Sequence, residues 1–151
     1  QFKGNNVMIG YYKNEEATAA TFTKDGWLKT GDLGVMNPDG TLFIRGRNKN
    51  MILSSNGQNI YPEEIEAVIN NYTGVIESVV VDRSGRLFAL TYFDPKYRES
   101  MSEVEFQKVM DESRDDVNKN MPSYSKVAKL EAMDAPFEKT PKMSIKRFLY
   151  S

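Results

Sequence analysis

Runs of apolar, β-branched and aromatic residues predict strands in several parts of the chain. Two such runs occupy residues 75–81 and 87–93, and Ser84-Gly85 between them is a turn signal, so they predict a hairpin. Asn37-Pro38-Asp39-Gly40 is a stronger turn signal, and it predicts a second hairpin over residues 34–45. Shorter strands are expected at residues 51–53 and 127–133.

Apolar residues at helical spacing predict two main helices. Pro62 stands where a first helical residue is favoured, and the two acids that follow it suit the positive end of a helix dipole. Ser102 and Glu105 form a capping-box pattern ahead of the second apolar stripe. The first stripe consists of Ile65, Val68, Ile69 and Tyr72, and shorter helices are expected at residues 14–23 and 144–150.

The order of these elements predicts an α+β fold in which the two ends of the chain differ. From residue 50 onward, the order βαββαβα predicts a β-hairpin and a small three-stranded sheet with helices packed on it. The strands of the first 46 residues have few local partners and no visible core. Because orphan strands expose unpaired edges, we expect this segment to be disordered or to pair with a second copy of the chain.

Composition removes several classes of chemistry. The 151 residues include no Cys and no His, which excludes disulfides, thiolate metal sites and His-based catalysis, and no metal site is expected. The net charge of −1 gives no global field for nucleic acid. No apolar run is long enough to span a membrane, and residues 1–10 lack a secretory pattern, so a cytoplasmic location is expected.

Charge is uneven near the end of the chain. Residues 137–151 contain four cations and one acid, a net charge of 4 − 1 = +3, whereas the whole chain carries −1. Such a basic tail suits a ligand that bears phosphate, although a solvated helix face is the commoner reason for such a cluster. The four cations are Lys139, Lys142, Lys146 and Arg147.

Three segments in order resemble one enzyme family. They are residues 26–34 (GWLKTGDLG), 40–49 (GTLFIRGRNK) and 59–66 (NIYPEEIE), and residues 7–18 also look like the segment that precedes the first of them. Together they resemble the adenylate-forming superfamily of acyl-CoA synthetases, luciferases and peptide-synthetase adenylation domains. Within it, the chain looks most like the bacterial long-chain fatty acid–CoA ligases.

The resemblance implies a two-step reaction that uses ATP, Mg²⁺ and coenzyme A, with a fatty acid as substrate. It also implies two domains: residues 1–48 would end the large N-terminal AMP-binding domain, and residues 49–151 would form the mobile C-terminal domain. The phosphate loop and the Tyr-Gly-x-Thr-Glu segment of the family are not found in this chain. We therefore expect the chain alone to be inactive. The full-length enzyme of which it would be a part, called the parent enzyme below, is expected to be cytoplasmic or peripheral to the membrane.

Four residues match positions with family roles. Asp32 matches the aspartate that accepts hydrogen bonds from the ribose hydroxyls of ATP, and Arg47 matches the arginine that contacts ribose or phosphate. Lys49 matches the hinge position, and Gly57 matches a glycine near the path of the CoA thiol. The competing interpretations are a turn aspartate, an exposed arginine, a linker lysine and a turn glycine.

The tail departs from the family pattern. The family has Thr-Pro-x-x-Lys here, and its lysine bridges the carboxylate and the α-phosphate during adenylation. Ser144 stands in place of that lysine, and a serine cannot supply the charge. Lys142 and Lys146 lie two residues on either side, and in an extended segment residues two apart share a face. Two outcomes therefore stay open: one of these lysines substitutes for the family lysine, or adenylation is slow.

Two other functions remain open. The first is an adenylating enzyme that uses another acid or acceptor, as in peptide synthetases and luciferases. The second, of a different class, is a non-catalytic interaction module that binds partners through its sheet or its basic tail.

Overall fold

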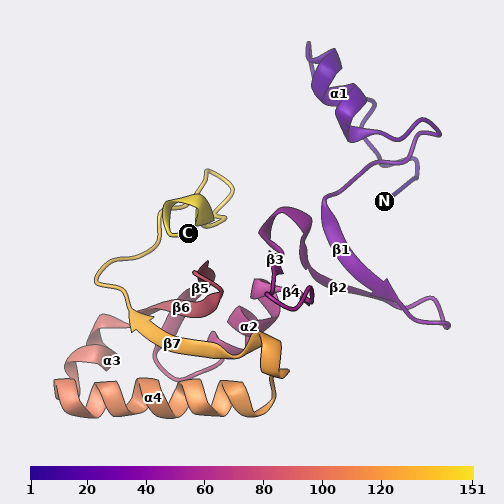
Figure 1. Cartoon of the computed structure of the whole chain (residues 1–151). Coiled ribbons are helices and arrows are strands. Elements are labelled where there is room, and N and C mark those ends of the chain that lie inside the picture. The colour runs from indigo at the N-terminus through magenta and orange to yellow at the C-terminus, as the bar shows by residue number, and fades with distance from the viewer. The chain divides into compact units, whose positions relative to one another are not determined.

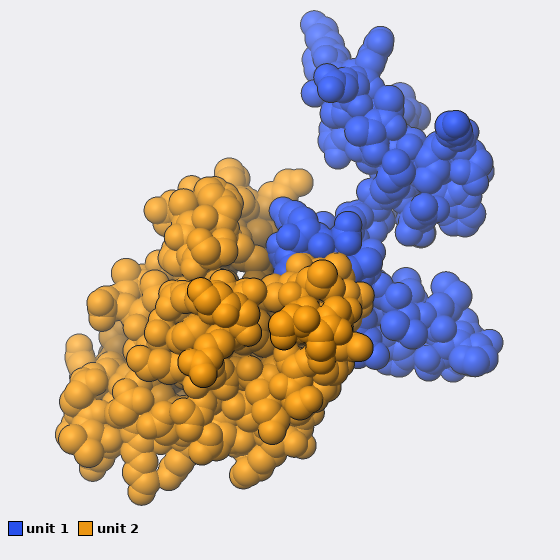
Figure 2. Space-filling model, in the orientation of Figure 1, with its two compact units in different colours: residues 1–50 blue, residues 51–151 orange.

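The computed structural model describes all 151 residues and divides them into two compact units. The units are Gln1–Asn50 and Met51–Ser151, and Figure 2 colours them separately. The division falls at the end of a short 3-10 helix, η1 (Asn48–Asn50).

The first unit contains one helix and one hairpin. Helix α1 (Glu15–Thr21) begins after Asn14, whose side-chain oxygen accepts a hydrogen bond from the backbone N–H of Ala17 at 2.9 Å. Strands β1 (Asp32–Met36) and β2 (Leu42–Arg47) pair antiparallel, which confirms the expected hairpin. The expectation of a disordered segment with few local partners is wrong, because β1 and β2 pair with each other. The alternative expectation, pairing with a second copy of the chain, stays a prediction. The absence of a core is confirmed, since Gly46 is the only buried residue of the unit.

Hairpin geometry accounts for two of the glycines in residues 26–34. Gly31, directly before β1, has a φ of 76°, a conformation that residues with a side chain rarely adopt. A Cβ on Gly34 would lie 2.8 Å from the carbonyl oxygen of Phe43 on the opposite strand. Gly34 also follows the irregularity in strand pairing between Leu33 and itself. Gly31 is therefore explained by its positive φ, and Gly34 by the close approach of the opposite strand.

The second unit is built on a mixed three-stranded sheet of order β5-β6-β7 (Figure 1). Strands β5 (Val75–Arg83) and β6 (Arg86–Phe93) form the expected antiparallel hairpin, and β7 (Val127–Ala132) pairs parallel with β6. A parallel neighbour requires a long crossover, which the helical segment between β6 and β7 provides. A separate two-stranded ribbon pairs β3 (Ile52–Leu53) with β4 (Asn59–Ile60).

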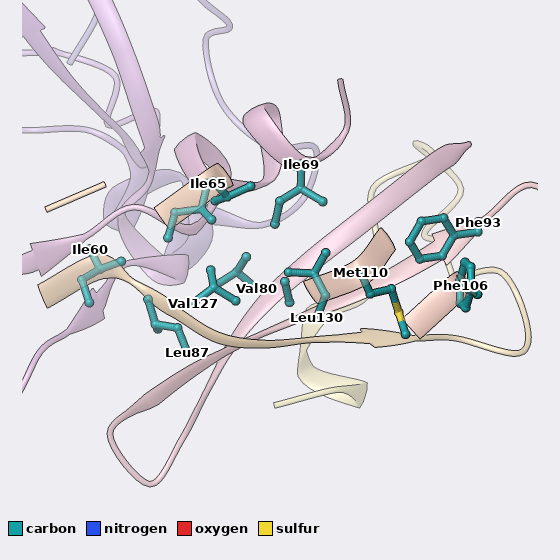
Figure 3. Packing of buried hydrophobic residues seen from close by; sticks show 12 residues of the cluster. Ile60, Ile65, Ile69, Val80, Leu87, Phe93, Phe106, Met110, Val127 and Leu130 are labelled. Atoms are coloured by element: carbon teal, nitrogen blue, oxygen red, sulfur yellow. The ribbon is translucent and has the colours of Figure 1, made fainter. Parts of the chain in front are cut away.

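Helices α2 (Pro62–Ile69) and α4 (Glu103–Lys119) pack on one face of this sheet. The capping box of Ser102 and Glu105 is confirmed at the start of α4. Helix α3 (Pro95–Glu99) was not predicted, although Asp94 caps it and Pro95 occupies its first position. None of these helices combines the length and apolar composition that a membrane crossing requires. Figure 3 shows the core between helices and sheet, including Ile65, Ile69, Val80, Leu87, Phe93, Phe106, Met110, Val127 and Leu130.

The chain after β7 covers the other face of the sheet. The buried Phe137 packs with Val79, Val81 and Leu90, and Ile145 and Tyr150 pack against this cluster. The predicted helix at 144–150 is wrong, because only η3 (Arg147–Leu149) is helical.

A small hairpin replaces the start of that predicted helix. Lys139 and Ile145 form an antiparallel bridge, and the N–H of Thr140 donates to the carbonyl of Ser144 at 2.8 Å. The chain turns at residues 140–143, where Pro141 suits the second position of a turn. We call residues 137–150 the tail loop.

One polar contact joins the segment that follows α2 to α4 and gives a testable titration. The Tyr72 hydroxyl donates to Oδ2 of Asp116 at 2.6 Å. Partial burial and this acid raise the pKa of Tyr72 to about 12. We expect the contribution of Tyr72 to folding stability to fall between pH 10 and about 12, because in this range the Tyr72 hydroxyl ionises in the unfolded chain but not in the folded one. Ultraviolet titration of Asp116→Asn should show an earlier transition, and an unchanged curve would contradict the assignment.

Candidate functional site

In the first unit, the hairpin brings Asp32 and Arg47 together as directly opposed residues. Nε of Arg47 lies 3.0 Å from Oδ1 of Asp32, and its guanidinium also donates to the carbonyl of Thr30 at 3.4 Å. The Asp32 side chain is 33% exposed and that of Arg47 is 55% exposed. The pair thus offers acceptor oxygens and guanidinium donors side by side on an accessible edge.

This arrangement is chemically suited to a nucleotide sugar and its phosphate. A carboxylate accepts from two neighbouring hydroxyls, while a guanidinium donates in a fixed fork to phosphate oxygens. An exposed ion pair of this kind contributes at most about 1 kcal/mol to folding stability. Stabilisation of the fold is therefore a weak explanation for the presence of this pair.

Lys49 lies within η1, at the boundary between the two units, and its side chain forms no hydrogen bond or ion pair. Gly57 closes the turn between β3 and β4, with a φ of 78° and a hydrogen bond from its N–H to the carbonyl of Ser54 at 2.9 Å. A Cβ on Gly57 would meet no atom within 4 Å. Gly57 is therefore both a turn glycine and a residue with open space beside it.

A pocket of about 380 Å³ lies beside this turn, entirely within the second unit. Its walls come from residues 52–56, the β5–β6 turn and the segment that leads into β7. It includes the side chains of Arg86, Tyr124 and Lys126, and no hydrogen bond or ion pair engages either of the two cations.

The pocket has one opposing acid. Asp82 also lines it, and its Oδ1 accepts a hydrogen bond from the N–H of Gly85 at 2.8 Å. Two cations against one acid leave the pocket with a positive charge, and hydroxyls of the β3–β4 turn add hydrogen-bonding groups. This combination suits a phosphate-bearing ligand. Sequence reasoning missed Arg86 and Lys126, because neither cation belongs to a recognisable motif.

The structure distinguishes between the two candidate lysines of the tail. Nζ of Lys146 lies 3.0 Å from Oε2 of Glu138, so its charge already has a partner. Lys139 pairs with Glu77 at 2.6 Å, and Arg147 pairs with Glu66. Lys142, in the turn of the tail loop, is exposed and forms no hydrogen bond or ion pair. Ser144 is exposed nearby and uses its N–H and carbonyl within the hairpin.

Acidic side chains do not gather into a metal site. No group of three or more Asp or Glu residues converges in a way that could hold a metal ion. We therefore assign no Mg²⁺ ligand to this chain.

Comparison with known proteins places the second unit in a family. The family described as "AMP-binding enzyme C-terminal domain" matches residues 49–150. "Probable acyl-activating enzyme 4" of Arabidopsis thaliana is 42% identical over 90 residues, which is 60% of this chain and 16% of that protein. The 2-succinylbenzoate–CoA ligase of Listeria monocytogenes is 47% identical over 81 residues, 54% of this chain and 17% of the ligase.

Solved structures agree over more of the chain. O-succinylbenzoate coenzyme A synthetase from Bacillus subtilis, in complex with AMP, aligns with a TM-score of 0.72 and 30% identity, over 98% of this chain and 28% of the synthetase. The adenylation domain of a carboxylate reductase from Mycobacterium chelonae aligns with a TM-score of 0.81 at 24% identity, over 93% of this chain and 24% of that domain, and supports the fold alone.

The chain therefore spans about a sixth of the length of the curated relatives it matches. The predicted α+β fold and the predicted resemblance to adenylate-forming enzymes are confirmed. Since the match covers residues 49–150, this chain belongs to the family of AMP-binding enzyme C-terminal domains.

Proposed function

We propose that this chain is the C-terminal portion of an acid–CoA ligase. The observation that carries the proposal is the family match over residues 49–150, together with relatives that are CoA ligases. In the proposed reaction, an acid carboxylate oxygen attacks the α-phosphorus of ATP and pyrophosphate leaves. The CoA thiolate then attacks the acyl carbon, the thioester bond forms and AMP leaves.

The proposed identity of the acid substrate depends on a pocket that lies outside these residues. The sequence resemblance favours a fatty acid. The relatives are named for 2-succinylbenzoate, sulfoacetate and 2-methylpropanoate, so the fatty acid is a proposal to be tested against these acids.

We assign residues 1–48 to the end of a larger AMP-binding domain and residues 49–151 to the mobile domain, with Lys49 as the hinge between them. The Asp32–Arg47 pair would bind the ribose and phosphate of ATP. Exposed apolar side chains on the hairpin support the assignment of residues 1–48 to a larger domain, since an apolar strand surface is normally covered by other parts of a protein. They include Val35, Met36, Leu42, Phe43 and Ile44.

The pocket beside Gly57 is the proposed contact for the phosphates of CoA. Its two cations, Arg86 and Lys126, have no protein partner, and Gly57 leaves space for the thiol arm. The same positive pocket argues against a non-catalytic interaction module. A concave, positively charged pocket suits a small phosphate-bearing ligand better than it suits the flat surface of a protein partner.

The test uses the full-length parent enzyme with ATP, CoA and a panel of acids. We expect AMP and a thioester to form with one class of acid, and none with the 151-residue chain alone. Arg86→Gln and Lys126→Gln should each raise the KM for CoA by roughly tenfold without changing pyrophosphate exchange. Lys129→Gln, an exposed lysine of β7, is the matched control.

The outcomes separate the proposals. No thioester with any acid, but adenylate formation and transfer to another acceptor, would favour the peptide-synthetase-like or luciferase-like alternative. No adenylate at all would favour the interaction module. An unchanged KM for CoA in both pocket variants would remove the pocket from the CoA site.

A further inference from the structure

Two acids of the second unit hold the tail loop at its two ends. The first is Glu66 of α2, whose side chain is only 8% exposed. Its Oε1 accepts from the guanidinium of Arg147 at 2.7 Å, and its Oε2 accepts from the second amino group of the same guanidinium. Such a two-point contact fixes orientation as well as distance.

Glu66 also joins the tail loop to the sheet. Its Oε1 accepts from the backbone N–H of Val80 at 2.6 Å, and β5 is an edge strand whose outer N–H groups have no strand partner. Burial raises the pKa of Glu66 above its ordinary value, while Arg147 and the Val80 N–H oppose that rise. One buried carboxylate thus connects α2, β5 and the end of the tail loop.

The second acid, Glu77 of β5, holds the beginning of the tail loop. Its Oε2 lies 2.6 Å from Nζ of Lys139, and its Oε1 accepts from the N–H of Phe137 at 3.1 Å. The Glu77 side chain is 12% exposed. Glu77 therefore fixes both a backbone atom and a side chain on the first arm of the tail hairpin.

The tail loop also closes on itself between these anchors. The N–H of Glu138 donates to the hydroxyl of Tyr150 at 2.8 Å, and the rings of Phe137 and Tyr150 meet edge to face at 4.9 Å. The turn at residues 140–143 has hydrogen bonds only within the hairpin. Its position therefore depends on the two arms, and the arms depend on Glu66 and Glu77.

We propose that Glu66 and Glu77 are positioning residues that hold the tail turn, and with it Lys142, in the place required for the adenylation step. This inference rests on the proposed function. Replacing a buried ion pair by apolar residues often costs no folding stability. We therefore attribute to these two ion pairs the orientation of the tail loop. The apolar contacts of Phe137 already attach the loop, but they fix no direction for the turn.

Two near-isosteric variants test this. Glu66→Gln keeps an acceptor for the Val80 N–H, and Glu77→Gln keeps one for the Phe137 N–H, but each removes the charge that faces a tail cation. Glu131→Gln is the matched control, since it breaks the Arg83–Glu131 ion pair elsewhere on the sheet. Arg147→Gln removes the first ion pair from the tail side, in case Glu66→Gln does not fold.

The first readout is amide hydrogen exchange in the chain itself. We expect exchange at residues 138–146 to rise by roughly tenfold or more in the Glu66 and Glu77 variants, with β6 unchanged, and no rise with Glu131→Gln. Unchanged exchange in the tail loop would overturn the proposal. This readout does not depend on any enzymatic activity.

The second readout is the pair of half-reactions in the parent enzyme. Pyrophosphate exchange should fall by roughly tenfold or more, whereas CoA transfer from supplied acyl-adenylate should change less than about twofold. Equal losses in both half-reactions would mean that the acids only stabilise the fold, and would overturn the positioning role. A wild-type parent without adenylation would refute the proposed function, while the exchange experiment would still decide whether the acids hold the loop.

Discussion

Phe106→Ala is expected to lower the free energy of unfolding of the second unit by about 3–5 kcal/mol. Phe106 of α4 is 1% exposed. Its ring meets that of Phe93 edge to face, with centroids 4.9 Å apart, and the guanidinium of Arg98 lies 4.1 Å from the ring centroid. The substitution would leave a cavity at the contact between α4 and the sheet and would remove both ring interactions.

Urea unfolding followed by helical circular dichroism measures this loss, because α4 is the longest helix of the chain, with 17 residues. Phe148→Ala is the matched control, since Phe148 is 73% exposed and its truncation should change stability by less than about 0.5 kcal/mol. Similar losses in the two variants would mean that α4 does not pack on the sheet as described.

Elements with their own local signals were predictable from the sequence. The hairpin of β5 and β6 carries two runs of apolar, β-branched and aromatic residues around a turn, and α4 carries a capping box, so local propensity and tertiary packing agree there. Helix α3 was missed even though Asp94-Pro95 is a start signal, because a helix of 5 residues is too short to show an apolar pattern at helical spacing.

The tail could not be predicted, because its structure depends on distant partners. Residues 144–150 have a helical apolar pattern, but Ile145 and Tyr150 instead pack on the sheet. Arg147 pairs with Glu66, which lies 81 positions earlier. Glu66 follows two other acids of α2, and nothing in the local sequence marks it as the partner of a tail cation.

The candidate nucleotide residues were predicted by motif, and the structure adds their geometry. Asp32 and Arg47 lie 15 positions apart, and the register of the hairpin makes them direct neighbours. The roles of these residues, and those of Lys49 and Gly57, stay predictions. The cations of the pocket, Arg86 and Lys126, come from segments far apart in the chain, and only the fold brings them together.

Lys142→Ala in the parent enzyme is expected to lower pyrophosphate exchange by a factor on the order of 10². Adenylation develops negative charge around the α-phosphate, and Ser144 supplies no cation for it. Among the four tail cations, three face acids: Lys139 faces Glu77, Lys146 faces Glu138 and Arg147 faces Glu66. Lys142 is the remaining cation, exposed in the turn and without a partner.

The measurement compares Lys142→Ala with Lys146→Ala and with Lys108→Ala, an exposed lysine of α4. If Lys142 supplies the charge, only its loss reduces pyrophosphate exchange by that factor, and CoA transfer from supplied acyl-adenylate is retained. Adding Ser144→Lys to the Lys142→Ala variant should then restore exchange, because Ser144 is exposed and its hairpin contacts use backbone groups that a lysine keeps. A larger loss with Lys146→Ala would instead mean that the Glu138 pair opens during catalysis. Normal exchange in both variants would mean that the larger domain alone stabilises the adenylation step.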